Sequence, residues 1–233
     1  MFKNLIYDIN SIKERDPAAR TSIEVFFVYS GLHAVIYHRI AHWFFKHKMF
    51  FIARMISQTA RFLTGIEIHP GATIGKGLLI DHGAGVVIGE TAVVGDNCTI
   101  YQGVTLGGTG KHTGKRHPTI GNNVMIGSGA KVLGPFKVGD NSKIAAGAVV
   151  LAEVPANCTA VGVPARIIYP GKRNCSEQPK KNDLDQIHIA DPVSLELCKL
   201  QTRVEHLEEL LKKYESKETD NNISKENDGN EAL

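Results

Sequence analysis

Hydrophobic residues in the first part of the chain recur at spacings of three and four. This spacing predicts amphipathic helices whose apolar faces contain Leu32, Val35, Ile36, Ile40, Trp43, Phe44, Phe51, Met55, Ile56 and Phe62. Gly65 is expected to end the last of these helices. Asp16 and Pro17 fit a helix N-cap followed by proline at the first helical position. We therefore expect residues 1–65 to form a helical N-terminal domain.

The hydrophobic period changes to six at Ile68. An aliphatic residue stands at thirteen positions from there on, and ten of the twelve intervals between them are six residues long. These positions are Ile68, Ile74, Ile80, Ile88, Val94, Ile100, Leu106, Ile120, Ile126, Val132, Val138, Ile144 and Val150. Glycine often follows the aliphatic residue, and in a helix each such glycine would cost ~1 kcal/mol. The period instead predicts a coil of short parallel strands whose aliphatic side chains point inward and whose glycines allow the backbone to turn.

The segments that follow the repeat differ from it and from one another. Residues 171–192 are expected to form a linker, and residues 216–233, which have few apolar side chains, a disordered tail. Between them, residues 193–215 predict an amphipathic helix or a short coiled coil of three heptads. A single helix lying on its own subunit is the alternative. The seam residues are Val193, Leu197, Leu200, Val204, Leu207, Leu211 and Tyr214.

Composition sets limits on the partners and the location of the protein. The formal net charge is +3 at pH 7, so no strong attraction to nucleic acid is expected. The four cysteines lack CxxC spacing and do not form a dense framework, which favours a reducing, cytoplasmic location. No secretory signal is recognisable, and the apolar stretch Val25–Tyr37 falls short of the ~20 residues that cross a bilayer. We interpret this stretch as a buried helix and expect no membrane association.

Two intervals interrupt the six-residue period, and both contain histidine. The first, Ile80–Ile88, includes Asp81 and His82, and the second, Leu106–Ile120, is glycine-rich and includes His117. Without the extra residues of the interruptions, roughly 25 residues separate the two histidines, which is about four faces of a triangular coil. The histidines should therefore lie on different faces. One site that uses both would form most easily between neighbouring subunits of a cyclic trimer.

These motifs together resemble those of the serine O-acetyltransferases, a family of hexapeptide-repeat acyltransferases. The resemblance spans roughly Arg15 to Ile168 and rests on the segments Arg15–Ala18, Asp81–Gly85, Gly89–Ala92, Gly107–Gly110, Arg116–Pro118 and Gly162–Arg166. It implies a left-handed parallel β-helix over residues 66–170 with an N-terminal helical domain, to which the heptad pattern adds a C-terminal helix. It also implies a homotrimer, possibly a dimer of trimers. The left-handed sense comes from the resemblance alone, since ordinary parallel crossovers are right-handed.

The implied reaction transfers acetyl from acetyl-CoA to the hydroxyl of L-serine and gives O-acetylserine for cysteine biosynthesis. A serine hydroxyl needs a base of near-neutral pKa, and His82 is the candidate. The resemblance places an orienting carboxylate at Glu67, where many relatives carry aspartate. Backbone N–H groups near the glycine-rich segment could stabilise the oxyanion. The transfer is expected to be direct, without an acyl-enzyme.

The resemblance also assigns residues to both substrates. Asp16 and Asp81 match partners of the serine ammonium group, while Arg116 and His117 match partners of its carboxylate or hydroxyl end. Acetyl-CoA needs a groove with small side chains along its pantetheine arm and cations near its phosphates, and the resemblance implies such a groove. Its residues are Gly108, Thr109, Ser128, Lys143, Ala146 and Arg166. No metal is expected.

Three alternatives stay open from the sequence. Other hexapeptide acyltransferases acetylate sugars or antibiotics with the same cofactor. A metal enzyme of the γ-type carbonic anhydrase kind could draw on His69, His82, His112 and His117. The coil could also be a scaffold whose C-terminal helix docks a partner. For the serine enzymes the resemblance implies feedback inhibition by cysteine and a complex with cysteine synthase, but this chain ends in Ala232-Leu233 and not in the isoleucine of relatives that bind that partner.

Overall fold

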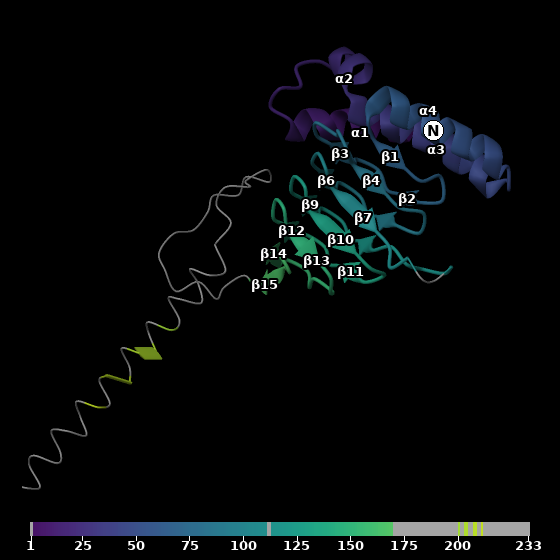
Figure 1. Cartoon of the computed structure of the whole chain (residues 1–233). Coiled ribbons are helices and arrows are strands. Elements are labelled where there is room, and N and C mark those ends of the chain that lie inside the picture. The colour runs from purple at the N-terminus through teal and green to yellow at the C-terminus, as the bar shows by residue number, and fades with distance from the viewer. Residues whose placement is uncertain are drawn as a thin grey trace, which may run out of the picture. The chain divides into compact units, whose positions relative to one another are not determined.

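The computed structural model describes residues 2–110 and 113–169 together with six residues of a C-terminal helix (Figure 1). Four helices come first: α1 (Phe2–Arg15), α2 (Ser22–Val28), α3 (Ser30–Lys46) and α4 (Phe50–Thr64). Fifteen short strands follow in the described ranges. They are β1 (Glu67–Ile68), β2 (Thr73–Ile74), β3 (Leu79–Ile80), β4 (Val87–Ile88), β5 (Val93–Val94), β6 (Thr99–Ile100), β7 (Thr105–Gly107), β8 (Thr119–Ile120), β9 (Met125–Ile126), β10 (Lys131–Leu133), β11 (Lys137–Val138), β12 (Lys143–Ile144), β13 (Val149–Val150), β14 (Thr159–Val161) and β15 (Arg166–Ile168).

The strands wind into a left-handed β-helix with three faces. Face A contains β1, β4, β7, β10 and β13; face B contains β2, β5, β8 and β11; face C contains β3, β6, β9, β12, β14 and β15. From β1 to β13 each strand pairs in parallel with the strand three places along the chain. At the end of the coil β12 pairs in parallel with β14, and β14 and β15 pair antiparallel. The chain therefore visits A, B and C once per turn, as the six-residue period predicts.

The aliphatic residues of the period form the core. Twelve of the thirteen are buried, and Ile74, in the first turn, is partly buried. Their registers stack them in columns, such as Ile88 on Leu106 and Leu106 on Val132 in face A. Each column is thus a continuous apolar contact that closes at every turn of the coil.

The corner between faces B and C is a column of residues with left-handed backbone. Asn97, Asn123, Asn141 and Asn157 all have φ between 54° and 60°, a conformation that asparagine tolerates better than most residues. Their amides also connect successive turns, since Asn123 donates to Asn141 at 3.2 Å and Asn141 to Asn157 at 3.3 Å. Asparagine therefore serves this corner in two ways: it adopts the left-handed backbone, and its side chain connects neighbouring turns.

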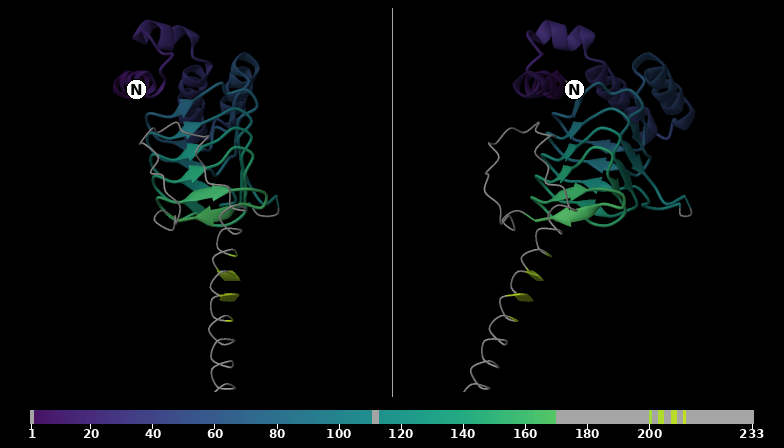
Figure 2. Two further views of the ribbon diagram at one scale, coloured as in Figure 1. Left: turned by 90° about the vertical axis from the view of Figure 1, so that its left-hand side faces the viewer. Right: turned by 60° about the vertical axis from the view of Figure 1, so that its left-hand side comes forward.

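Helix α1 attaches the helical domain to the top of the same corner. Asp8 accepts a hydrogen bond from the Gly77 N–H at 2.7 Å, and Arg15 donates to the Asn97 and Cys98 carbonyls at 3.0 Å. Beside these contacts, Leu79 of β3 is buried in an apolar cluster with residues of α1, α2 and α3. The helices thus lie at the N-terminal end of the coil (Figure 2).

Two sequence predictions about this domain are wrong, and one is confirmed. Asp16 is not an N-cap: it follows the end of α1, and Thr21 caps α2 by accepting from the Glu24 N–H at 3.1 Å. An aspartate before proline suits a turn equally well, and here Asp16 accepts from the Ala18 N–H at 2.8 Å. The stretch Val25–Tyr37 is not one buried helix, because α2 and α3 separate at Tyr29. Gly65 does end α4, with φ +72°.

Not all of the apolar residues that the spacing in α4 predicts to be on its buried face are buried. Phe51 is 77% exposed and Phe62 is 88% exposed, whereas Ala53, Ser57 and Ala60 are buried. The small residues let α4 pack closely on its neighbours, so the large aromatic side chains project outward. Within the described part of the chain, no helix is long and apolar enough to cross a membrane.

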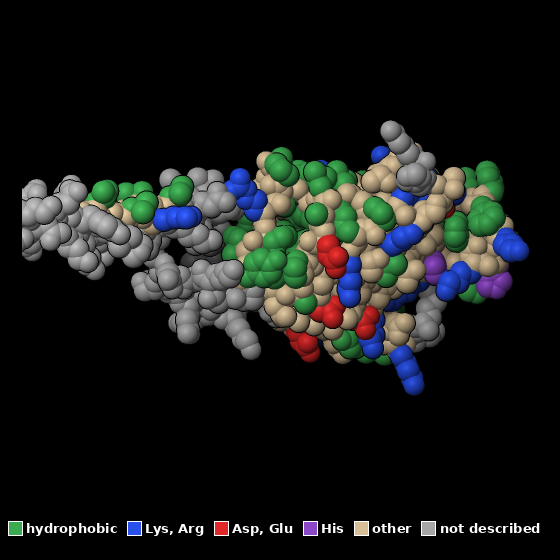
Figure 3. Space-filling view, turned by 90° about the horizontal axis from the view of Figure 1, so that it is seen from below, with side chains coloured by type: hydrophobic (Ala, Val, Ile, Leu, Met, Phe, Trp, Pro, Cys, Tyr) green, Lys and Arg blue, Asp and Glu red, His purple; other side chains and the backbone are tan. Residues whose placement is uncertain are grey.

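The surface of the coil carries both signs of charge. In the view from below, Lys and Arg side chains are interspersed with acidic and apolar ones (Figure 3). No broad field of one sign covers this face of the described molecule. A charged ligand would therefore have to be recognised by local groups.

The C-terminal segment forms a separate unit, Ala190–Leu233. Its described residues are helical, and four of them are seam positions with exposed side chains. These are Leu200, Val204, Leu207 and Leu211. The other seam positions, the linker 171–192 and the tail 216–233 lie outside the described residues.

His38 in α3 predicts how the stability of the protein depends on pH. Its side chain is buried, and burial, reinforced by His42 and Arg39, lowers its pKa from 6.5 to about 3. The unfolded chain therefore binds a proton below pH 6.5 that the folded chain refuses until about pH 3. The free energy of unfolding should fall on acidification through this window, with a contribution from His38 of up to about 1.4 kcal/mol per pH unit.

Thermal unfolding of wild type and His38→Leu between pH 7 and pH 4 would measure this contribution. The wild type should lose stability more steeply than His38→Leu. The exposed His47, changed to leucine, is the matched control and should keep the wild-type slope. Parallel slopes for wild type and His38→Leu would contradict the assignment.

Candidate active site

The first interruption of the period forms the corner between β3 and β4, which we call the histidine corner (Asp81–Gly85). His82 has φ +60°, and tight turns close on either side of it, with Gly83 N–H donating to Asp81 O and Ala84 N–H to His82 O, both at 2.7 Å. A side chain at Gly83 would collide with Ile66, so the corner lies close against the first turn. The His82 side chain projects outward and is 76% exposed, with Nε2 3.8 Å from Asp81 Oδ1.

Two predicted acetyl-CoA residues lie in the same column as the histidine corner. Backbone hydrogen bonds of 2.8 Å connect successive turns there, from Gly103 N to Ala84 O, Gly129 N to Gln102 O, and Gly147 N to Ser128 O. Ser128 and Ala146 follow His82 along this column, and neither is buried. The corner therefore provides an imidazole at one end of a strip of small residues.

The second interruption lies between β7 and β8, at the corner between faces A and B. Its described ends include Gly108 and Thr109 after β7, and Arg116 and His117 before β8, and they leave the coil as Figure 1 shows. In contrast to His82, His117 is only 8% exposed. Side chains at Gly89 or Gly108 would overlap or crowd its ring, so both glycines leave room for the imidazole.

The surroundings of His117 keep its ring neutral. Its Nδ1 accepts a hydrogen bond from the Thr91 N–H at 3.2 Å. Burial lowers the pKa of His117, and the positive charge of Arg116 lowers it further. An imidazole held in this way is suited to hydrogen bonding with a ligand and poorly suited to accepting a proton.

Arg116 is anchored by the turn above it. Its guanidinium donates a hydrogen bond to the Glu90 carboxylate, and this bond is the main reason that the pKa of Glu90 lies below its usual value. The Arg116 side chain remains 25% exposed. A carboxylate ligand could therefore reach the Arg116 guanidinium, which Glu90 already holds in one orientation.

Asp16 and Asp81 approach the same tyrosine. The Tyr29 hydroxyl donates to Asp16 Oδ2 at 2.7 Å. The pKa of Tyr29 is raised, first by burial and then by Asp16, and Asp81 also contributes to the shift. Asp16, in the turn after α1, and Asp81, in the histidine corner, therefore both act on Tyr29, although the two carboxylates are far apart in sequence.

Glu67 forms an ion pair that the sequence pattern does not predict. It lies in β1, and its carboxylate forms a 3.0 Å ion pair with Arg61 of α4. The carboxylate nearest to His82 among the described ion pairs is Asp81. The orienting role expected of Glu67 therefore stays a prediction, and it would require Glu67 to exchange or share Arg61.

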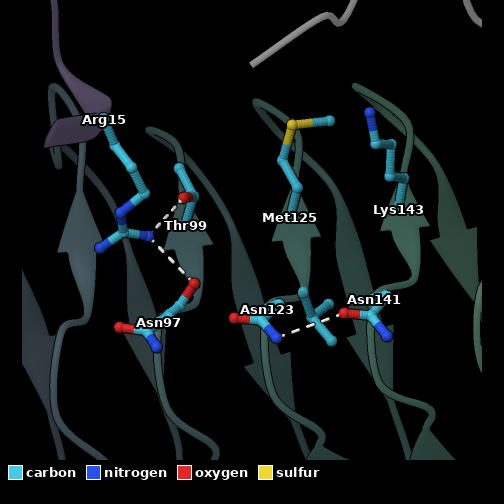
Figure 4. A pocket seen from close by; sticks show the side chains of 8 residues that line it. Arg15, Asn97, Thr99, Asn123, Met125, Asn141 and Lys143 are labelled. Atoms are coloured by element: carbon cyan, nitrogen blue, oxygen red, sulfur yellow. Dashed lines mark hydrogen bonds between the residues drawn. The ribbon is translucent and has the colours of Figure 1, made fainter. Parts of the chain in front are cut away.

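The remaining predicted cofactor residues lie elsewhere on the coil. Lys143 begins β12 and lines a pocket of about 330 Å³ beside the asparagine column, where Arg15 and Thr99 also lie (Figure 4). Arg166 lies in β15, in the last described turn. Within one chain, the predicted acetyl-CoA residues thus lie on different parts of the coil and do not form a single site.

The two histidine-bearing corners also remain separate within one chain. The histidine corner leads into face A through β4, whereas Arg116 and His117 follow face A after β7. Among residues 2–110 and 113–169, no three His, Cys, Asp or Glu side chains are grouped closely enough to hold a metal ion. His112, which the metal hypothesis invokes, lies outside the described residues.

Known protein families match the coil. The family model described as bacterial transferase hexapeptide (six repeats) matches residues 117–152, and that described as hexapeptide repeat of succinyl-transferase matches residues 85–108. With the three-faced coil and the projecting His82, these matches define a hexapeptide-repeat transferase.

A serine acetyltransferase of Synechococcus elongatus is 52% identical over 211 residues, which cover 91% of this chain and 84% of the relative. The chain therefore belongs to the serine acetyltransferase family, and the resemblance noted in the sequence is confirmed. Soybean serine acetyltransferase complexed with serine superposes with a TM-score of 0.70 at 44% identity, covering 71% of this chain and 68% of that one. The enzyme from Brucella abortus strain S19 in complex with coenzyme A gives 0.70 at 48% identity, covering 72% and 67%.

The packing of His117 on Gly89 can be tested with a single methyl group. Gly89→Ala would place a Cβ where the ring lies, so His117 must move while the core of the coil is unchanged. We expect acetyl transfer to fall by about 100-fold or more, because a misplacement of ~1 Å can have this effect. Gly114→Ala, in the same interruption, meets no atom within 4 Å and should retain wild-type turnover. Equal activity of the two variants would contradict a role for the His117 position.

Proposed function

We propose that this chain transfers acetyl from acetyl-CoA to the hydroxyl of L-serine and produces O-acetylserine for cysteine biosynthesis. The observation that carries the proposal is the exposed His82 on a left-handed corner next to Asp81. Family membership supports both substrates, since one relative is described in complex with serine and another with coenzyme A. The buried free thiols Cys98 and Cys158 suit the reducing cytoplasm.

In the proposed mechanism His82 is the general base. It removes the proton from the serine hydroxyl as the oxygen attacks the thioester carbonyl, and a C–O bond forms. The tetrahedral intermediate then breaks its C–S bond. The proton held by His82 passes to the departing CoA sulfur, so the histidine returns to its neutral form. The acetyl group thus moves directly to serine without an acyl-enzyme.

The amino-acid substrate would be recognised at both of its charged ends. Asp16 and Asp81, which share Tyr29 as a neighbour, would bind the ammonium group. Arg116, already directed by Glu90, would bind the carboxylate, and His117 would add a neutral hydrogen bond. A sugar has neither charged end, so this arrangement favours an amino acid over a sugar acceptor.

The site would be shared between subunits of a homotrimer. One subunit would contribute the histidine corner with Ser128 and Ala146, and its neighbour Arg116 and His117 with Gly108 and Thr109. This division follows from the separation of the two corners within one chain. The cations Lys143 and Arg166 would meet the phosphates of CoA.

Two apolar surfaces are consistent with further assembly. The exposed leucines of the C-terminal seam would be buried if three such helices paired as a coiled coil. The exposed aromatic residues of α4, Phe51 and Phe62, could pair two trimers. Sedimentation of the purified chain distinguishes a trimer from a hexamer.

The reaction is tested by thiol release from acetyl-CoA with serine, homoserine and simple sugars as acceptors. Serine should be preferred, and His82→Ala should lower turnover with serine by about 100-fold or more, because a general base typically contributes 10²–10⁴-fold. His82 is exposed, so the variant should retain the oligomer and the thermal stability of wild type. Unchanged turnover in His82→Ala would refute its role as base, and preference for a sugar would refute the acceptor.

Complementation tests whether the site is shared. His82→Ala and Arg116→Ala chains, each inactive alone, should regain activity when they are co-expressed and purified through two different tags. Purification through both tags leaves only mixed trimers, and in each of them one of the three sites combines two intact halves, so recovery should approach about a third of wild-type turnover.

The matched control joins two variants of the same corner. His82→Ala and Asp81→Ala damage the same half of the site, so their mixed trimers should stay inactive. Absence of recovery in the His82 and Arg116 mixture would place both groups in one chain and contradict the shared site.

A further inference from the structure

We propose that Thr91 is a positioning residue for acetyl transfer: its hydroxyl and its own N–H fix the His117 ring with the proton on Nε2, so that Nε2–H donates to the bound amino acid. This inference rests on the proposed function, because it takes serine to be the ligand that contacts His117.

The first observation is that Thr91 holds the returning end of the second interruption. Thr91 lies in the turn between β4 and β5, and its Oγ1 accepts hydrogen bonds from the N–H groups of Arg116 at 3.0 Å and His117 at 3.1 Å. Its carbonyl accepts from Lys115 Nζ at 2.6 Å. One threonine thus fixes three consecutive residues of a segment 24 to 26 positions away.

The second observation concerns the two atoms of Thr91 that face His117 Nδ1. The Thr91 N–H donates to Nδ1 at 3.2 Å, and Oγ1 lies 2.9 Å from the same nitrogen. Because Oγ1 already accepts two N–H groups, its own hydrogen is the one available for Nδ1. A nitrogen that accepts from two donors carries no proton, so the neutral ring must carry its proton on Nε2.

The third observation is that two glycines border Nε2. Glycine occupies positions 89 and 108, where an added Cβ would overlap or crowd this nitrogen. The hydrogen bonds of the ring within the described part of the chain all involve Nδ1, so Nε2–H can donate to a ligand in the direction that the ring position sets.

On balance, burial and the charged groups around His117 also disfavour a charged ring. Arg116 and Lys115 on its own segment disfavour a second positive charge, while Glu90 in the turn above favours it. His69, one turn further along this corner, also interacts with His117 electrostatically. Burial and the cations outweigh Glu90, so a neutral ring agrees with the hydrogen-bond geometry.

The experiment compares Thr91→Val with Thr91→Ser. Valine keeps the shape and the N–H but removes the hydroxyl, whereas serine keeps the hydroxyl. We expect Thr91→Val to lower kcat/KM for serine by at least about three- to ten-fold, mainly through KM, because the hydroxyl that bonds the ring and accepts from the Arg116 and His117 N–H groups is lost. The acid limb of its pH profile should also move to higher pH, since His117 then accepts a proton more easily. Thr91→Ser should restore both properties.

A purely structural role for Thr91 would give a different pattern. A loosened segment would also raise KM for acetyl-CoA, because Gly108 and Thr109 belong to it, and it would leave the pH limb in place. That pattern, or wild-type kinetics in Thr91→Val, would overturn the proposal while leaving the proposed function intact. Failure of the wild type to acetylate serine would instead refute the proposed function.

A measurement on the wild-type protein keeps the test independent of how Thr91→Val folds. The ¹⁵N spectrum of histidine-labelled protein at neutral pH distinguishes the two neutral forms and the charged form of each ring. The His117 signal can be identified by its absence in His117→Gln. A neutral ring protonated on Nε2 is expected, and a ring protonated on Nδ1 or on both nitrogens would overturn the inference.

Discussion

The stacking of aliphatic side chains at six-residue intervals is the interaction on which the rest of this structure depends. Each buried residue, such as Leu106, lies between equivalent residues of the turns before and after it. A strand of two or three residues has little stability alone, so the columns must hold all turns together. This requirement leaves only the corners free to vary, and the chemistry is accordingly found at corners.

The three corners have different roles because their residues make different demands on the backbone. The asparagine corner is regular and serves as the attachment point of α1. The histidine corner accepts a left-handed His82, a conformation that costs roughly 1–2 kcal/mol for a residue other than glycine. The third corner accommodates the glycine-rich interruption. Strain and insertion thus occur where side chains must project from an otherwise uniform coil.

The sequence predicts the coil well because its signal is local and repeated many times, whereas single features of the helical domain are ambiguous. Asp16 before Pro17 can cap a helix or form a turn, and the spacing alone does not show that it lies in the turn after α1. Contacts such as Thr91 with His117, or Glu67 with Arg61, join distant positions without any periodic signal. The candidate residues could therefore be named from the sequence, but their partners could not.

The two histidines differ in a way that assigns them distinct chemistry. A general base must be reachable by its substrate, and the exposed His82 next to Asp81 meets this condition. His117 is buried, faces Arg116, and has its Nδ1 occupied by Thr91, so a second proton would be opposed by burial, charge and hydrogen bonding together. The groups that lower the pKa of His117 surround its ring, and the hydrogen bonds from Thr91 also set the orientation of that ring. In the proposed mechanism one histidine moves a proton and the other holds a hydrogen bond, and a site that uses both must bring two different corners together.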